Sequence, residues 1–229
     1  MSDEHEALQE RLQYRFRAPS LLNEALTHRS VSEHNNERLE FLGDAVLNFV
    51  IASELFHRQP GDSEGDLSRL RASLVNRQTL AGIARDLDLG ACLRLGSGER
   101  KSGGRRRDSI LSDALEGVFG AVYLDGGFEV GEALILRLFR ERLENLPAAR
   151  ELKDPKTRLQ ELLQSRRQPL PAYEVVEVTG QAHDQSFRVS CRIDGMDLES
   201  QGVAGSRRQA EQVAAREMLA IIREPETGG

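Results

Sequence analysis

The spacing of apolar residues changes near residue 150, and this change constrains the fold more than any other feature of the sequence. Before it, apolar side chains recur every three or four residues, as in Leu67, Leu70 and Leu74, which is typical of amphipathic helices. After it they alternate, as in Phe187 and Val189, which is typical of strands with one buried face. The sequence therefore predicts an all-helical part followed by a part that contains strands.

A short segment of low apolar content separates the two parts. It contains Pro147 and Pro155, and such composition is typical of a linker. We predict an all-α domain over residues 1–146, a linker over residues 147–153, and a small α+β domain over residues 154–224.

The second part has clear signals for the ends of its elements. Asp154 is a candidate N-cap for a helix over residues 155–165, and Ser206 is a candidate N-cap for a last helix that ends near residue 223. Asp194-Gly195 predicts a tight hairpin turn. Strands are expected at residues 173–178, 187–193 and 196–203. The predicted order is helix, three strands, helix.

The net charge restricts where an RNA-binding surface can lie. The 229 residues carry a net charge of −6, whereas binding to nucleic acid depends mainly on neutralising phosphates. Neither part of the chain is basic overall, so any RNA-binding surface must be a local patch.

Several features predict a cytoplasmic protein. No apolar run approaches the ~18 residues that span a bilayer, and the first residues do not resemble a signal peptide. Cys92 and Cys191 are far apart and have no neighbouring Cys or His at metal-ligand spacing, so we expect two buried, reduced thiols and no zinc site. We expect no membrane partner.

Three carboxylates share one stripe of a predicted helix. Glu37, Glu40 and Asp44 fall within roughly 60° of one another at about 100° per residue. The apolar residues of this helix point broadly the other way: Leu42, Val46 and Phe49. By itself this pattern fits a solvated polar face or a binding site, because like charges on one stripe repel each other.

A second predicted helix favours the binding site. Residues 110–124 are apolar almost all round, so this helix should be buried, and it contains no Lys or Arg to pair with Asp113 and Glu116. Gly117 and Gly120 would allow another helix, such as the one with Glu37, to approach closely. Five carboxylates and no histidine describe hard oxygen ligands for Mg²⁺ or Mn²⁺. A ferritin-like di-iron site is a weaker alternative, because it needs Glu-x-x-His pairs.

Residues 36–47, which read NERLEFLGDAVL, closely resemble the signature of the ribonuclease III family. Five further segments agree with that family in order and spacing: residues 25–30, 64–68, 101–104, 109–116 and 154–161. The resemblance covers almost the whole chain. It implies an all-α ribonuclease III endonuclease domain followed by an α-β-β-β-α double-stranded RNA-binding domain.

The resemblance also implies an activity. Members hydrolyse double-stranded RNA with Mg²⁺, for which Mn²⁺ can substitute, and leave 5′-phosphates, 3′-hydroxyls and short 3′ overhangs. They process ribosomal RNA precursors and some messenger RNAs. The family works as a homodimer, in which each subunit has one site.

By resemblance, four carboxylates bind the catalytic metal: Glu40, Asp44, Asp113 and Glu116. Asp44 and Glu116 are the expected catalytic residues. Glu37 and Glu64 match supporting acidic positions, although Glu64 also fits the acidic first turn of a helix. We expect His28 to be a hydrogen-bonded structural residue rather than a general base.

The RNA-binding domain has its own implied contacts. By resemblance, Gln160 and Glu161 touch 2′-hydroxyls in one minor groove and His183 enters the next, while Arg207 and Arg208 hold phosphates. Many members have a third basic residue where this chain has Gln209, which weakens the expected phosphate contact. The basic loop at residues 105–107 could meet RNA or only be solvated.

Two other classes of protein remain as alternatives. A catalytically silent duplex-RNA binder would be expected to have lost part of the acidic set, which is intact here. A helical scaffold with a protein-binding second domain would show no Mg²⁺ dependence and no preference for duplex RNA.

Overall fold

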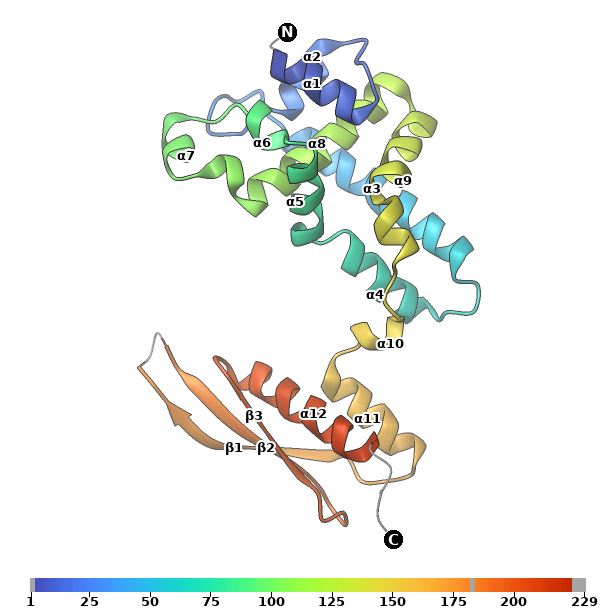
Figure 1. The fold of residues 1–229 in the computed structure, drawn as a ribbon, viewed down its shortest axis with the longest axis vertical. Coiled ribbons are helices and arrows are strands. Elements are labelled where there is room, and N and C mark those ends of the chain that lie inside the picture. Colours follow the sequence, from blue (N-terminus) through green and yellow to red (C-terminus); the bar gives the residue numbers. More distant parts are fainter. Residues whose placement is uncertain (1–2, 182–183, 224–229) are drawn as a thin grey trace. The chain divides into compact units, whose positions relative to one another are not determined.

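The computed structural model describes residues 3–181 and 184–223, without the side chains of Arg150 and Arg223. The chain divides into two compact units, residues 1–149 and residues 150–229 (Figure 1). The division falls within the segment expected to be a linker, where the structure has a four-residue helix, α10 (Ala149–Leu152).

The first unit is built from helices. They are α1 (Asp3–Leu12), α2 (Pro19–Ala25), α3 (Glu37–Arg58), α4 (Glu64–Leu74), α5 (Arg77–Asp86), α6 (Leu89–Cys92), α7 (Ser97–Lys101), the 3₁₀ turn η1 (Gly104–Arg106), α8 (Asp108–Gly126) and α9 (Phe128–Glu144). Apart from one β-bridge between Thr27 and Arg94, the described residues of this unit form no strand. The all-α prediction is confirmed.

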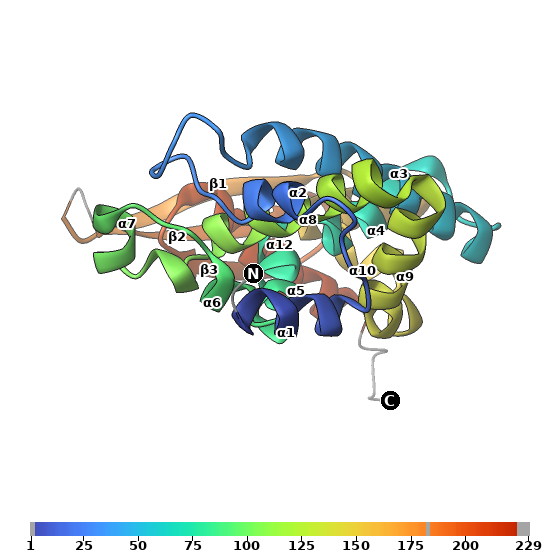
Figure 2. The same ribbon diagram turned by 90° about the horizontal axis from the view of Figure 1, so that it is seen from above.

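Helix α8 is the centre of this unit, because it contacts α2, α3, α5 and α9 (Figure 2). Most of its apolar residues are buried, as predicted from its sequence, and Val118 and Phe119 are fully buried, whereas Leu124 near its C-terminal end is 53% exposed. Gly120 faces the backbone of α3, where a Cβ would lie 2.2 Å from the carbonyl oxygen of Leu39. The predicted close approach of the two carboxylate-bearing helices is therefore present.

The apolar face of α3 differs from the single stripe that the sequence predicts. Val46 is buried, whereas Phe49 is 60% exposed and Phe41 is 80% exposed. The reason is that α3 has two apolar faces. One packs on α8, and the aromatic residues of the other stay largely exposed, although Phe49 packs edge-on against Phe128 of α9.

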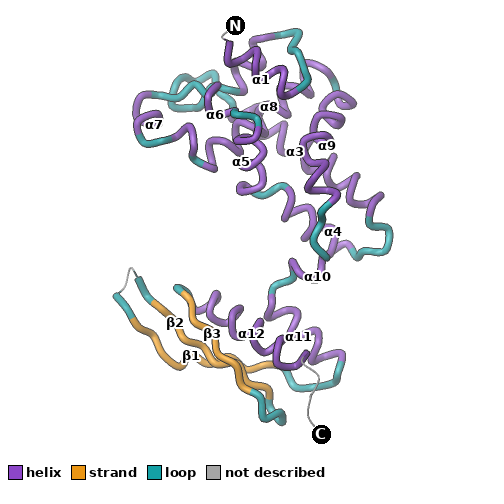
Figure 3. The backbone as a smooth tube through the Cα atoms, in the orientation of Figure 1, coloured by secondary structure: helices purple, strands orange, loops and turns teal. Residues whose placement is uncertain are grey.

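The second unit has the predicted order of elements. These are α11 (Pro155–Ser165), β1 (Pro171–Thr179), β2 (Ser186–Ile193), β3 (Glu199–Ala204) and α12 (Arg207–Arg223). The sheet is antiparallel with the order β1-β2-β3, and both helices cover one of its faces (Figure 3). Leu159, Cys191 and Met218 represent the core between sheet and helices. The predicted α-β-β-β-α fold is confirmed.

Both predicted N-caps of this unit are present. The Asp154 carboxylate accepts a hydrogen bond of 2.9 Å from the backbone N–H of Lys156, and the Ser206 hydroxyl accepts one of 3.3 Å from that of Gln209. The tight turn predicted at Asp194-Gly195 is present, because the backbone N–H of Met196 donates a 3.1 Å hydrogen bond to the carbonyl oxygen of Ile193, but it does not join the two strands directly. Strands β2 and β3 pair only from Arg192 and Glu199 outwards, so the turn belongs to a longer loop and β3 begins later than predicted.

Among the helices of the described residues, none combines the length and the apolar character needed to cross a membrane.

Candidate active site

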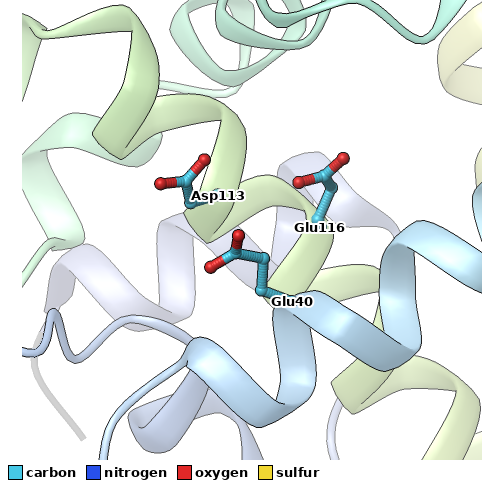
Figure 4. A group of neighbouring side chains, drawn as sticks. All are labelled: Glu40, Asp113 and Glu116. Atoms are coloured by element: carbon cyan, nitrogen blue, oxygen red, sulfur yellow. The ribbon is translucent and has the colours of Figure 1, made fainter.

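Three of the predicted carboxylates meet between α3 and α8. Oxygen atoms of Glu40, Asp113 and Glu116 all lie within 4.8 Å of one another, and all three side chains are half-buried (Figure 4). Glu40 comes from α3, and the other two come from successive turns of α8. The cluster therefore depends on the close packing of the two helices.

The cluster is electrostatically unfavourable without a cation. Burial raises the pKa of Glu116 to about 8, with further contributions from the charges of Asp44, Glu40 and Asp113. Burial also raises the pKa of Glu40, and the negative charge of Asp113 raises it further. A divalent cation bound between the carboxylates would offset the repulsion among their negative charges. Carboxylate oxygens are hard ligands, so this set of donors fits Mg²⁺ or Mn²⁺.

Asp44, the fourth predicted metal ligand, is not part of this group. It lies one turn along α3 from Glu40 and is exposed, and its Oδ1 accepts a 2.7 Å hydrogen bond from the side-chain amide of Asn48. Asp44 is nevertheless close enough to raise the pKa of Glu116. It therefore lies at the edge of the cluster.

A hollow of about 270 Å³ adjoins the cluster and is lined in part by Glu37, Glu40 and Asp113. Its walls also carry two arginines that the sequence analysis did not place at the site. Arg29 Nη1 lies 3.4 Å from Glu37 Oε1, and Arg107 Nη1 lies 2.6 Å from Glu99 Oε2. Both positive and negative groups therefore line the hollow.

Two further residues from the sequence analysis have structural contacts. Glu64 lies in the first turn of α4 and accepts a 2.8 Å hydrogen bond from the Ser68 hydroxyl; it lines neither the cluster nor the hollow. His28 lines the hollow, and its Nδ1 is 2.8 Å from the Ser30 hydroxyl. Both contacts fit the structural alternatives described above.

Four of the five predicted RNA-binding residues lie on α11 and α12. Gln160 and Glu161 are exposed on α11, and the Glu161 carboxylate is 2.6 Å from Lys153 Nζ. Arg207 and Arg208 are exposed at the start of α12. His183 lies outside the described residues.

The cysteines are free and buried, as predicted. Burial raises the pKa of the Cys92 thiol to about 11, so this thiol is protonated and unreactive at neutral pH.

Both parts of the chain match known domain families. Residues 18–143 match the model described as ribonuclease-III-like, and residues 155–222 match the double-stranded RNA binding motif. Ribonuclease 3 of Alkalilimnicola ehrlichii is 65% identical over 214 residues, which are 93% of this chain and 94% of that protein. Ribonuclease 3 of Hahella chejuensis is 57% identical over 222 residues, which are 97% of this chain and 98% of that protein.

Solved structures agree with these matches. The nuclease domain of ribonuclease III from Campylobacter jejuni, at 46% identity, superposes with a TM-score of 0.61 over 64% of this chain and all of that domain. A second structure of that domain, at 49% identity, has a TM-score of 0.59 over 59% of this chain and 96% of its own length, and it is described as flexible in a region involved in dimer formation.

The first unit is thus an endonuclease domain, and the second is a double-stranded RNA binding motif. The chain belongs to the ribonuclease III family, so the resemblance and the endoribonuclease predicted from the sequence are confirmed.

Proposed function

We propose that this endoribonuclease cuts double-stranded RNA by Mg²⁺-dependent hydrolysis at the cluster of Glu40, Asp113 and Glu116, with Mn²⁺ able to substitute. The observation that carries the proposal is the convergence of three carboxylates within 4.8 Å without a histidine among them. Mg²⁺ is usually held by a few carboxylates and retains several waters, which suits phosphoryl chemistry.

Each acidic residue has a proposed part in the reaction. Glu40, Asp44, Asp113 and Glu116 would hold the metal, with Asp44 and Glu116 as the catalytic residues. A bound Mg²⁺ supplies the means to activate a water molecule and to offset negative charge on the departing 3′-oxygen. The side-chain amide of Asn48 donates a hydrogen bond to Asp44 Oδ1 and would orient that carboxylate.

Glu37 and Glu64 are proposed as supporting residues. The better supported of the two is Glu37, because it lines the hollow next to the metal ligands and is paired with Arg29. We propose that it helps to place the scissile phosphodiester there. For Glu64, the hydrogen bond from Ser68 favours a role in the start of α4.

The second unit is proposed to hold the duplex by its shape. Gln160 and Glu161 would contact 2′-hydroxyls, His183 the next minor groove, and Arg207 and Arg208 the phosphates between them. The exposure of both arginines at the N-terminus of a long helix supports phosphate binding there.

We propose that the nuclease unit forms a homodimer through the second apolar face of α3. Phe41, Phe49 and Phe56 are each at least 60% exposed along this helix, and the Phe49 ring lies 5.5 Å from that of Phe128 on α9. Exposed apolar surface of this kind is typical of protein interfaces. In the related domain of Campylobacter jejuni, one region is involved in dimer formation.

We further propose that the protein acts in the cytoplasm and that it processes ribosomal RNA precursors and some messenger RNAs. Products would carry 5′-phosphates, 3′-hydroxyls and short 3′ overhangs. The two buried, free thiols are in keeping with a reducing compartment.

The proposal is tested with a perfectly paired, end-labelled RNA of thirty base pairs, incubated with Mg²⁺, Mn²⁺ or EDTA. We expect staggered cuts with either metal and none in EDTA, and phosphatase treatment should reveal the 5′-phosphates. Binding of the duplex without cleavage in either metal would instead support the catalytically silent binder.

A further inference from the structure

One carboxylate of the second unit is held between two cations that belong to different helices. Glu211, one turn into α12, accepts a 2.6 Å hydrogen bond from Lys156 Nζ and a 2.9 Å hydrogen bond from Arg207 Nε. Its side chain is only 11% exposed. These bonds outweigh the effect of burial and keep the pKa of Glu211 below its usual value, so the carboxylate is charged.

The bond to Glu211 involves the inner nitrogen of Arg207. A guanidinium has five N–H donors, and four of them are on the two terminal nitrogens, which form the fork that binds phosphate. The Arg207 side chain is still 64% exposed while its Nε is bonded to Glu211. Glu211 therefore fixes the base of the guanidinium and leaves the fork available.

Lys156 compensates for the charge of Glu211. Its ammonium lies 2.6 Å from the carboxylate and 4.5 Å from the centroid of the Tyr173 ring, which also favours a cation. Two positive groups thus share one negative group. The group of Lys156, Arg207 and Glu211 therefore carries one net positive charge, even though an acidic residue lies directly beside Arg207.

Fixing the Arg207 side chain before RNA binds lowers the entropy that is lost on binding. A free arginine side chain loses rotamer entropy when it binds a phosphate, and a side chain that is already fixed loses less. We propose that Glu211 is a positioning residue for duplex RNA, which holds the Arg207 guanidinium ready for a backbone phosphate. This inference rests on the proposed phosphate contact of Arg207.

A positioning role for Glu211 and a purely electrostatic role predict opposite effects of Glu211→Gln on RNA affinity. Neutralising an acidic residue next to a phosphate-binding arginine should strengthen RNA binding, because repulsion between carboxylate and phosphate is removed. If Glu211 instead positions Arg207, the same substitution should weaken binding. The sign of the change therefore separates the two roles.

The experiment measures binding of the full-length protein to a labelled RNA duplex in EDTA, over a series of salt concentrations. For Glu211→Gln we expect about three- to fivefold weaker binding, the size of a partly exposed charged contact. The slope of log K against log salt should become shallower by up to ~0.9, the value for one phosphate contact. Glu217→Gln, an exposed position on the same helix, is the matched control and should bind no more weakly than the wild type.

A second set of variants shows whether Glu211 acts through Arg207. In the Arg207→Ala background, Glu211→Gln should cause no further loss of affinity, whereas an independent role would give additive losses. If Glu211→Gln fails to fold, Arg207→Lys provides a second test that leaves the buried Glu211 unchanged. This variant keeps the positive charge but lacks the Nε donor to Glu211, so it should bind RNA more weakly than the wild type.

The outcomes are distinguishable. Unchanged or tighter binding by folded Glu211→Gln, or full affinity of Arg207→Lys, would overturn the positioning role alone. Failure of the wild type to bind duplex RNA would overturn the proposed function of this unit and the inference with it.

Discussion

Gly43 of α3 and Glu116 of α8 are in backbone contact: a Cβ added to Gly43 would lie 1.8 Å from the carbonyl oxygen of Glu116. Gly120 makes the reciprocal contact, since its Cβ would lie 2.2 Å from the carbonyl oxygen of Leu39. The two helices therefore meet through glycines at the level of the acidic cluster. This contact brings Glu40 close enough to Glu116 to share a metal ion.

Gly43→Ala should damage both stability and the site. The added methyl group meets backbone rather than a movable side chain, so the helices must separate, at a cost of about 1–3 kcal/mol in the free energy of unfolding. Urea unfolding measures this loss, and Gly61→Ala is the control because a Cβ there meets nothing within 4 Å. Equal stability of both variants would contradict the tight contact.

Glu116→Gln should stabilise the metal-free protein. Its charge is disfavoured by burial and by three neighbouring carboxylates, so its removal should raise the free energy of unfolding by about 0.5–2 kcal/mol. The same variant should lose the stabilisation by Mg²⁺, which for the wild type is about 2.7 kcal/mol at a hundred times the Kd. Thermal melts with EDTA and with Mg²⁺ measure both effects.

The control is Glu10→Gln, an exposed position on α1. It should melt like the wild type and respond to Mg²⁺ in the same way. A Glu116→Gln variant that is less stable without metal, or still stabilised by Mg²⁺, would argue against a repulsive metal site.

Phe41→Asp should convert the proposed dimer to a monomer. Phe41 is 80% exposed, so the substitution leaves the core of the unit intact, but it places a charge in the proposed interface. Analytical ultracentrifugation at micromolar concentration measures the change. Val31→Asp, at another exposed apolar residue, should remain dimeric. A Phe41→Asp protein that also stays dimeric would place the interface elsewhere.

Asp125 should contribute to stability at neutral pH and lose this contribution in acid. Burial alone would raise its pKa, but hydrogen bonds from the Tyr14 hydroxyl (2.6 Å) and the backbone N–H groups of Arg17 and Ala18 hold the pKa below the usual 3.8. A carboxyl group whose pKa is lower in the folded state than in the unfolded state stabilises the fold when the pH is above the unfolded pKa. This stability is lost as the pH falls through the folded pKa.

The variant Asp125→Asn should therefore be less stable than the wild type at pH 7, and the difference should shrink toward pH 2 to 3. Unfolding by urea across this range measures the trend, with the exposed Asp62→Asn as control. A difference that stays constant with pH would mean that the charge of Asp125 is not involved.

Local signals predicted most of the fold. The change from helical to alternating spacing separated the two units, and Asp154 and Ser206 marked the starts of two helices. The apolar sequence of α8 indicated that Asp113 and Glu116 are enclosed and need a partner. These features depend on residues close together in the chain, which is why the sequence alone reveals them.

The remaining features depend on packing between distant segments. The sequence predicts Phe49 as a core residue, because it lies at helical spacing from the apolar residues Leu42 and Val46. Only the position of α8 decides which face of α3 is covered. Arg29 and Arg107 come from separate loops, and nothing in their local sequence places them at one hollow. The position of Asp44 at the edge of the cluster depends on side-chain contacts that spacing does not determine.

The carboxylates between α3 and α8 are proposed to cut duplex RNA with a metal ion. The most direct test is single-turnover cleavage of a thirty-base-pair RNA in Mg²⁺ by the wild type, Glu116→Gln and the Glu10→Gln control, with duplex binding measured in parallel. We expect Glu116→Gln to bind the duplex normally and to lose cleavage by a factor of about a hundred to a thousand, as when a group that stabilises the transition state is removed. Cleavage by Glu116→Gln at the rate of the control would contradict the claim and place the reaction outside this cluster.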